Sequence, residues 1–227
     1  MALIPSLIPL GLFGGTFNPI HFGHLRLAQE LSQALNVERV KFIPSGRPPH
    51  RNLNLATAEH RVAMVKLAIQ GNSRFECDTR EVDRASLSYS VDTLKDLRQE
   101  LGDEFSFCFF MGSDAFLGLS TWHEWQTLFE LTHIIIGQRP GFQNIAAAQL
   151  PPALATQFYK RQQTSSDFIK TRNAGGIYVV DINLLNISAT RIRRDVRNMV
   201  SPCYLLPDSV LEYVTQHHLF KETADAA

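Results

Sequence analysis

Two histidines lie three residues apart near the start of the chain, in the stretch GGTFNPIHFGH, residues 14–24. We expect a helix over 22–36, so this spacing puts His21 and His24 on one face of its first turn. Gly23 leaves the surface between the two rings bare. The amides of a first helical turn are unpaired and lie at the positive end of the helix dipole. Two imidazole donors beside them therefore predict a small site for anionic oxygens such as phosphate.

The turn before these histidines is not one of the common nucleotide-binding loops. Gly14 and Gly15 lack a Cβ, which allows positive φ and lets a phosphate or ribose approach the backbone closely. Neither GxxxxGK[ST] nor GxGxxG is present, so a hydride-transferring dehydrogenase has little support. A single histidine at a helix start is usually a capping or packing residue, which is the alternative for each ring alone. Zinc has less support, because two nitrogens and Asn18 make a poor ligand set.

A second group of polar side chains occurs near the other end of the chain, in ISATRIRRDV, residues 187–196. Ser188 is a typical N-cap, and Thr190 lies inside the first turn of the helix that it would begin. Together with Arg193, a hydroxyl, free amides and a guanidinium converge on one space, which favours a second anionic group. For any single arginine here, a solvated basic helix surface is the alternative.

Apolar, β-branched runs alternate along the chain with segments of helical periodicity, as in a parallel sheet covered on both faces. We therefore expect an α/β fold, a single Rossmann-like, doubly wound domain with a mainly parallel sheet and helices on both faces. Such sheets bind ligands beyond the carboxyl ends of their strands, where both motifs lie. The expected strands are 7–13, 38–43, 74–78, 105–111, 133–137 and 176–181. The expected helices are 22–36, 58–70, 90–101, several up to residue 130, 188–199 and 208–218.

Length and charge limit the organisation of the chain and its partners. With 227 residues, 44% of them hydrophobic, it can fill one sizeable core, so we expect one domain over 1–227 with an irregular helical insertion over about 141–176. Lys plus Arg equals Asp plus Glu at 22 each, so no long-range field would gather nucleic acid or an anionic membrane. The apolar opening, residues 1–13, lacks a basic flank and is too short to span a bilayer, which predicts a cytoplasmic protein. The three cysteines are expected to be buried reduced thiols, at Cys77, Cys108 and Cys203.

These two motifs resemble those of a known superfamily. GGTFNPIHFGH is similar to the GxFxPxHxGH motif of the nucleotidyltransferases, and ISATRIR is similar to their ISSTxIR motif, with Ala189 in place of the second serine. Members join a phosphate-bearing acceptor to a nucleoside monophosphate from ATP or CTP and release pyrophosphate. The resemblance implies His21, His24 and Arg193 as the catalytic residues. The residues that it implies for ATP binding are Gly14, Gly15, Thr16, Phe17, Asn18, His21, His24, Gly112, Asp114, Ser188, Thr190 and Arg193.

Four stretches between these motifs indicate the acceptor. They resemble the bacterial nicotinate-nucleotide adenylyltransferases, a family of NAD biosynthesis. The stretches are KFIPSGRPPHR (41–51), LSYSVDTL (87–94), FMGSDAFLGLSTWHEW (110–125) and IIIGQRPG (134–141).

These stretches carry groups that could bind a pyridine nucleotide. Two prolines stiffen a loop that presents His50 and Arg51, groups suited to an acceptor phosphate. The resemblance implies that Tyr89 and Ser90 supply backbone contacts to the nicotinate carboxylate, with Ser90 in place of the usual threonine. It further implies that Trp122 covers the pyridine ring, as an aromatic side chain beyond a strand end can do. For Trp125 we expect core packing, and for Asp114 the alternative is capping of the helix that follows.

The implied reaction is that of ATP and nicotinate mononucleotide, giving deamido-NAD and pyrophosphate, with Mg²⁺ bound mainly through the ATP phosphates and no metal ligands in the protein. A sister adenylyltransferase acting on nicotinamide mononucleotide or phosphopantetheine is the close alternative, because the phosphate chemistry is shared. From a different class, a non-catalytic ATP-binding regulator would keep the fold without turnover. An aminoacyl-tRNA synthetase is disfavoured by length, by the absence of a KMSKS-like loop and by the neutral charge.

Overall fold

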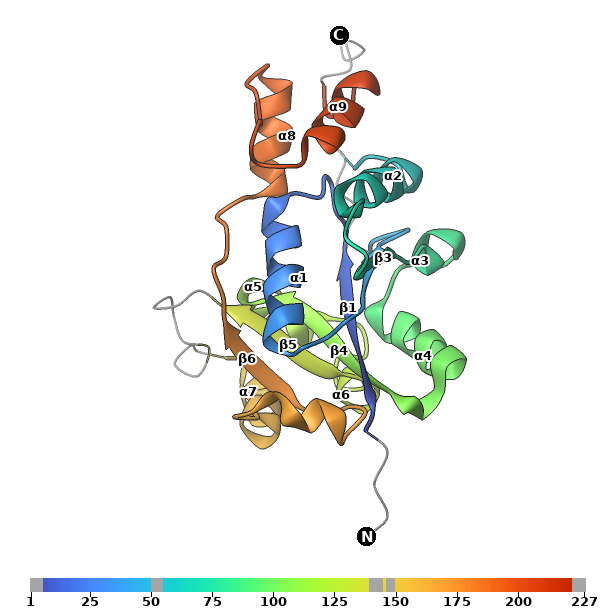
Figure 1. Ribbon diagram of the computed structural model, residues 1–227, viewed down its shortest axis with the longest axis vertical. Helices are drawn as coiled ribbons and strands as arrows, with labels where there is room; N and C mark the ends of the chain where they lie inside the picture. The colour runs from blue at the N-terminus through green and yellow to red at the C-terminus, as the bar shows by residue number, and fades with distance from the viewer. Residues whose placement is uncertain (1–5, 50–54, 139–144, 146–149, 222–227) are drawn as a thin grey trace.

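The strands of this protein pair in parallel in a single sheet with the order β3-β2-β1-β4-β5-β6 (Figure 1). This computed structural model describes residues 6–49, 55–138, 145 and 150–221. The chain winds outward from β1 to β3, returns to β4 beside β1, and then winds outward the other way, so its switch point lies between β1 and β4. The strands are β1 (Ile8–Gly15), β2 (Val40–Pro44), β3 (Phe75–Cys77), β4 (Phe105–Gly112), β5 (His133–Gln138) and β6 (Ile177–Asp181).

Both faces of the sheet are buried, which explains why its strands read as continuous apolar runs. In β4, Phe107 and Phe109 belong to the core on one face, and the alternate residues Cys108 and Phe110 belong to the core on the other. This is the period of two that a strand imposes on its side chains. Neither face of β4 is left for solvent.

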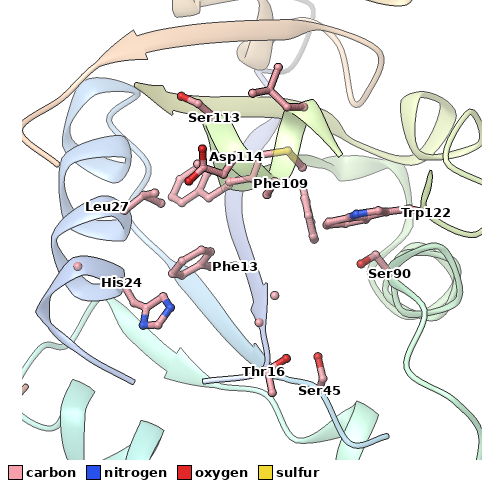
Figure 2. A pocket seen from close by; sticks show the side chains of 18 of the residues that line it. Phe13, Thr16, His24, Leu27, Ser45, Ser90, Phe109, Ser113, Asp114 and Trp122 are labelled. Atoms are coloured by element: carbon pink, nitrogen blue, oxygen red, sulfur yellow. The ribbon is translucent and has the colours of Figure 1, made fainter. Parts of the chain in front are cut away.

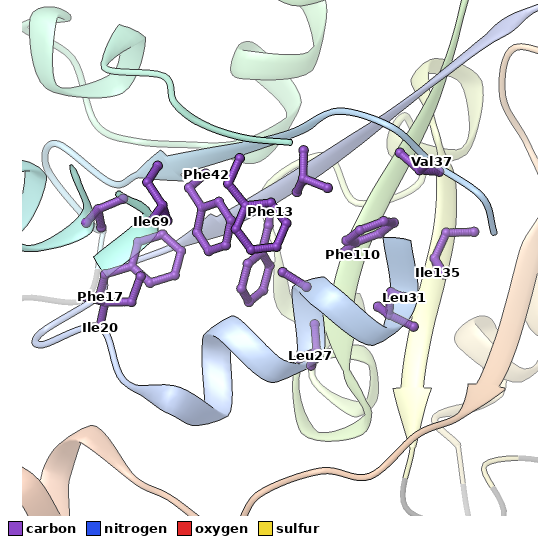
Figure 3. Packing of buried hydrophobic residues seen from close by; sticks show 14 of the residues in the cluster. Phe13, Phe17, Ile20, Leu27, Leu31, Val37, Phe42, Ile69, Phe110 and Ile135 are labelled. Carbon is purple, nitrogen blue, oxygen red and sulfur yellow. The ribbon is translucent and has the colours of Figure 1, made fainter. Parts of the chain in front are cut away.

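One face is covered by α1 (Phe22–Ala34), α2 (Ala58–Ile69), α8 (Ala189–Arg197) and α9 (Asp208–Gln216). Figure 3 shows Leu27 and Leu31, one helical turn apart on α1, packed toward Phe13 and Phe110 of the sheet. The i, i+4 stripe of α1 therefore fixes the helix that begins at the histidine pair directly above β1 and β4.

The opposite face is covered by α4 (Ser90–Leu101), α6 (Leu128–Leu131) and α7 (Pro152–Arg161). Val91, Leu94 and Leu97 form the buried stripe of α4. Short segments complete the connections: α3 (Arg80–Asp83), α5 (Ser113–Leu117), and single 3₁₀ turns at Gly102–Glu104, Leu119–Thr121 and Ser166–Lys170.

The predicted fold class is confirmed, and the expected strands and long helices all occur within a few residues of their predicted bounds. The described part of 141–176 contains α7, whose Leu154 and Phe158 are buried, and the 3₁₀ segment at Ser166–Lys170. The expectation of three buried thiols was wrong: Cys108 is buried, but Cys77 is half-buried and Cys203 is exposed. No helix within the described ranges is long and apolar enough to cross a membrane.

Candidate active site

A cleft of about 1290 Å³ opens at the carboxyl ends of β1 and β4. This is the switch point of the sheet, where the chain begins to add strands on the other side of β1. Figure 2 shows His24 and Leu27 of α1 on one side of it, and Trp122 and Ser90 on the other. The cleft is large for a small-molecule site and has room for two nucleotides. Its lining includes most of the sequence-predicted residues, namely Gly14, Gly15, Thr16, His21, His24, Tyr89, Ser90, Gly112, Asp114, Trp122 and Ser188.

The two histidines are held against each other at the start of α1. His21 is the N-cap, in extended backbone conformation, and its ring stacks on that of His24 with 3.7 Å between ring centroids and 22° between planes. The backbone N–H of His21 donates to Nδ1 of His24 at 3.3 Å. A Cβ on Gly23 would lie 2.9 Å from the His21 ring, so only glycine leaves room for this stack.

Burial controls the charge of both rings. Loss of solvent lowers the pKa of His21 to about 4. Desolvation, and then the neighbouring His21, lower the pKa of His24 well below its usual value. Both imidazoles are therefore neutral at pH 7. Because Nδ1 of His24 accepts a hydrogen bond, the hydrogen of its neutral ring is assigned to Nε2.

The second motif forms the helix start that the sequence predicts. Ser188 is the N-cap of α8, and its hydroxyl accepts from the N–H of Arg191 at 3.5 Å. Nη1 of Arg193 donates to the carbonyl of Asn18 at 2.7 Å, and Nη2 donates to the hydroxyl of Thr190 at 3.2 Å. Arg193 thereby links α8 to the turn before α1, although neither it nor Thr190 lines the cleft in the described structure.

Aromatic side chains form the far wall. Tyr89 is the N-cap of α4, and its ring lies 4.4 Å from that of His123. Trp122 follows the 3₁₀ turn after α5 and meets Phe109 edge to face at 6.3 Å. Trp125 instead packs against Phe129 at 6.1 Å, and it is absent from the lining of the cleft. A flat ring entering this side of the cleft would meet Trp122.

Gly112 and Asp114 lie where β4 runs into α5. Gly112 is the N-cap residue of this short helix, so Asp114 is one residue inside it and does not occupy the capping position. Its carboxylate is exposed on the cleft, as Figure 2 shows. Asp114 is therefore not the cap that was its alternative role, although an acidic side chain in the first turn still complements the helix dipole.

Some expected site residues do not face the cleft. Phe17 is 2% exposed and packs in the core, and the positive φ of this turn, 49°, occurs at Phe17 rather than at Gly14 or Gly15. Asn18 is also buried, and its Oδ1 accepts from the N–H of Ala56 at 3.1 Å. These two residues shape the turn. The predicted acceptor residues His50 and Arg51 lie outside the described residues.

Other residues of the site were missed. Leu27, Ser45, Glu81, Ser113 and His123 line the cleft without having been singled out. Arg61 lies behind it, in the first turn of α2, and is 1% exposed.

A signal for Arg61 exists in the sequence. Arg61 stands at i, i+3 and i+4 with Met64 and Val65, so a charge occurs on the buried stripe of an expected helix. Glu81 and His123 carry no such periodic signal, because they reach the cleft from a four-residue helix, α3, and from a turn.

Comparison with known proteins gives the following matches. The cytidylyltransferase-like family model matches residues 12–195. A protein of Dechloromonas aromatica named probable nicotinate-nucleotide adenylyltransferase is 46% identical over 215 residues, which cover 95% of this chain and 99% of the relative. A protein of Acidithiobacillus ferrooxidans with the same name is 42% identical over 212 residues, with coverage of 93% and 95%. The Plasmodium falciparum nicotinic acid mononucleotide adenylyltransferase complexed with NaAD has a TM-score of 0.70 at 16% identity, covers 93% of this chain and 97% of its own, and so supports the fold alone.

Proposed function

Since the chain belongs to the cytidylyltransferase-like family, we propose that it is a nicotinate-nucleotide adenylyltransferase, which moves AMP from ATP to nicotinate mononucleotide and releases pyrophosphate and deamido-NAD. The observation that carries this proposal is the pairing within one cleft of the stacked histidines His21 and His24 with the aromatic wall at Tyr89 and Trp122. One side offers donors to phosphates, and the other offers a surface to a pyridine ring. We take the whole chain, residues 1–227, as a single nucleotidyltransferase domain.

On the nucleotide side, the turn over residues 14–18 would seat adenosine and the α-phosphate. His21 and His24 would donate neutral N–H groups to phosphate oxygens, while Gly112 and Asp114 would contact the nucleoside and its ribose. The start of α8, with Ser188 and Thr190, would receive the β- and γ-phosphates. Arg193 would hold the same phosphates, because it uses two of its N–H groups within the protein and a guanidinium has five.

On the acceptor side, Tyr89 and Ser90 begin α4, where backbone amides are unpaired and suit a carboxylate. Trp122 would stack on the pyridine ring. His50 and Arg51 would bind the acceptor phosphate. Ser90 in place of threonine is compatible with this role, because the proposed contacts are made by the backbone.

The chemistry needs no general base. An oxygen of the acceptor phosphate forms a bond to the α-phosphorus while the bond from that phosphorus to the bridging oxygen of pyrophosphate breaks. With a second pKa near about 6, the acceptor phosphate is largely a dianion at neutral pH. The site then acts by placing two anions in line and by stabilising the charge that develops on the leaving pyrophosphate.

Mg²⁺ would enter with the triphosphate. Within the described ranges, no cluster of three or more His, Cys, Asp or Glu side chains could hold a metal ion. The donors around the cleft fit an ion that keeps phosphate oxygens and water as its ligands. Such an ion supplies neutralisation of the phosphate charge.

The test is pyrophosphate release by the purified protein with ATP and Mg²⁺, comparing nicotinate mononucleotide, nicotinamide mononucleotide and phosphopantetheine as acceptors. A strong preference for the first is expected. Release with another acceptor would keep the phosphate chemistry and overturn the roles of Ser90 and Trp122. ATP binding with no release from any acceptor would indicate a non-catalytic regulator.

A further inference from the structure

Arg61 carries a buried charge directly behind the cleft. Its Nε donates to the carbonyl of Ala56 at 3.1 Å, Nη1 to that of Thr16 at 2.9 Å and Nη2 to that of Gly46 at 3.1 Å. Burial lowers the pKa of Arg61 from the ordinary arginine value, but a guanidinium stays protonated in proteins. A full positive charge is thus held inside the protein by three backbone dipoles.

Two of these carbonyls belong to the nucleotide side of the cleft. Thr16 lines the cleft within the turn after β1. Ala56 donates its own N–H to Oδ1 of Asn18 at 3.1 Å, and the carbonyl of Asn18 accepts Nη1 of Arg193 at 2.7 Å. Arg61 is therefore connected to the arginine of the second motif by hydrogen bonds that meet at two residues, Ala56 and Asn18.

The third carbonyl leads to the acceptor side. Gly46 presses on the backbone after β3 so closely that a Cβ there would stand 2.0 Å from the carbonyl oxygen of Glu81. The next residue, Arg47, exchanges two hydrogen bonds with Ser88: its N–H donates to the serine hydroxyl at 3.0 Å, and its carbonyl accepts the serine N–H at 2.9 Å. Ser88 immediately precedes Tyr89, the N-cap of α4.

We infer that Arg61 is a positioning residue, which fixes the distance between the nucleotide and acceptor subsites by clamping the loops after β1 and β2 to α2. This inference rests on the proposed function, because in-line transfer requires both substrates at once. The planar fork of a guanidinium determines where three carbonyls lie relative to each other. A lysine ammonium is a point charge on a flexible stem, and it would keep the charge but lose this geometry.

The experiment compares Arg61→Lys with the unaltered protein, measuring kcat, both KM values and the Kd for ATP alone, at a temperature at which both are folded. Each subsite keeps its own residues in this variant, so ATP affinity should change less than about threefold. Small misplacements of reacting groups are costly, so kcat should fall roughly 10-fold to 100-fold.

Arg98→Lys is the matched control. Arg98 also holds backbone carbonyls, those of Gly102, Phe105, Leu131 and Asn173, but it does so around the amino end of β4, away from the cleft. We expect a lower melting temperature with kcat within about twofold of the unaltered protein, because distant sites act independently. A merely structural role for Arg61 predicts that the two variants behave alike.

Gly46→Ala disturbs the same loop at its contact with Glu81, and it replaces Arg61→Lys as the test if Arg61→Lys does not fold. Its Cβ must separate the β2 loop from Glu81, so kcat should again fall more than ATP affinity. Unaltered kcat in Arg61→Lys, or in Gly46→Ala where the former does not fold, would overturn the positioning role alone, as would an equal loss in Arg98→Lys. No turnover by the unaltered protein would overturn the proposed function first, and the positioning role with it.

Discussion

The two stacked histidines combine properties that a lone imidazole at a helix start does not have. Each ring limits the orientations of the other, and the hydrogen bond from the backbone of His21 assigns the tautomer of His24. The buried Nδ1 of His21 has no hydrogen-bond partner among the described residues. Buried polar atoms without partners are uncommon and often occur at functional sites. These features support the proposed role of the pair, because fixed donors aimed at an anion are what phosphoryl chemistry without a base requires.

Replacing one ring should separate turnover from stability. For His24→Ala we expect kcat to fall about 10² to 10³ fold, the usual cost of removing a donor to developing charge. The free energy of unfolding should change by less than about 1 kcal/mol, because functional residues are seldom optimised for stability. Pyrophosphate release and thermal unfolding measure the two effects. His60→Ala is the control, since His60 bonds the hydroxyl of Tyr213 at 2.9 Å between α2 and α9, outside the cleft lining. Normal turnover by His24→Ala would contradict the assignment.

The lowered pKa values of His21 and His24 make a prediction about the pH profile. Both rings are neutral above their ordinary pKa, so raising the pH from 7 to 8.5 removes no proton from either. The value of kcat/KM for ATP at saturating acceptor, which reports the enzyme–acceptor complex that ATP meets, should therefore show no loss with an apparent pKa between 6.5 and 7.5. A loss in that window that disappears in His24→Gln would show that a charged imidazole is needed.

At the scale of elements, the sequence was most informative where a periodic pattern coincides with a cap. The helix at 188–199 has both, with Ser188 at its start and the buried Ile192 within it, and it forms as α8. The segment before Ser90 was harder to predict, because α3 is only four residues long and has no periodicity to detect. The positive φ of Phe17 was also missed, because glycines next to it were the more probable place for that conformation.

The start of α1 allows activity to be changed more than stability. Alanine is favoured over glycine in a helix by up to about 1 kcal/mol, which offsets part of the cost of moving the His21 ring, so the melting temperature of Gly23→Ala should change little. Its Cβ would stand 2.9 Å from the ring of His21 and must displace it. We expect kcat/KM for ATP to fall roughly tenfold to a hundredfold. Gly118→Ala is the control, because a Cβ there makes only ordinary contacts, and equal activities of the two variants would argue against the need for a bare surface.

At the scale of the whole molecule, the fold was predictable but its long-range polar contacts were not. Alternating elements and the ends of β1 and β4 locate the cleft without any structure. The pairs that complete it are distant along the chain, as in Arg61 with Thr16 or Arg193 with Asn18. One sequence shows that a charge lies on an apolar stripe, but it does not show which carbonyls meet it. Sequence reasoning therefore found many of the residues that line the cleft and missed the groups that hold them in place.

The protonation of His133 makes the stability of the fold depend on pH. It is fully buried in β5, its Nδ1 accepts the N–H of Gly176 at 2.9 Å, and its Nε2 lies 2.9 Å from the carbonyl of Arg172. This arrangement fits only the neutral ring with its hydrogen on Nε2, because a second hydrogen on Nδ1 would face the N–H of Gly176. Burial accordingly lowers the pKa of His133 to about 4.

The folded state thus takes up the proton of His133 less readily than the unfolded state, whose pKa is near the ordinary 6.5. The contribution of this group is complete above pH 6.5, declines as the pH falls from 6.5 to about 4, and then levels off, a loss on the order of 3 kcal/mol. His21 and His24 act with the same sign, so the unaltered protein should lose stability steeply across this window. His133→Gln cannot titrate, and in urea unfolding it should be less stable at pH 7.5 but decline less steeply toward pH 4.5. An unchanged pH slope in His133→Gln would assign the acid sensitivity to other groups, the cleft histidines first among them.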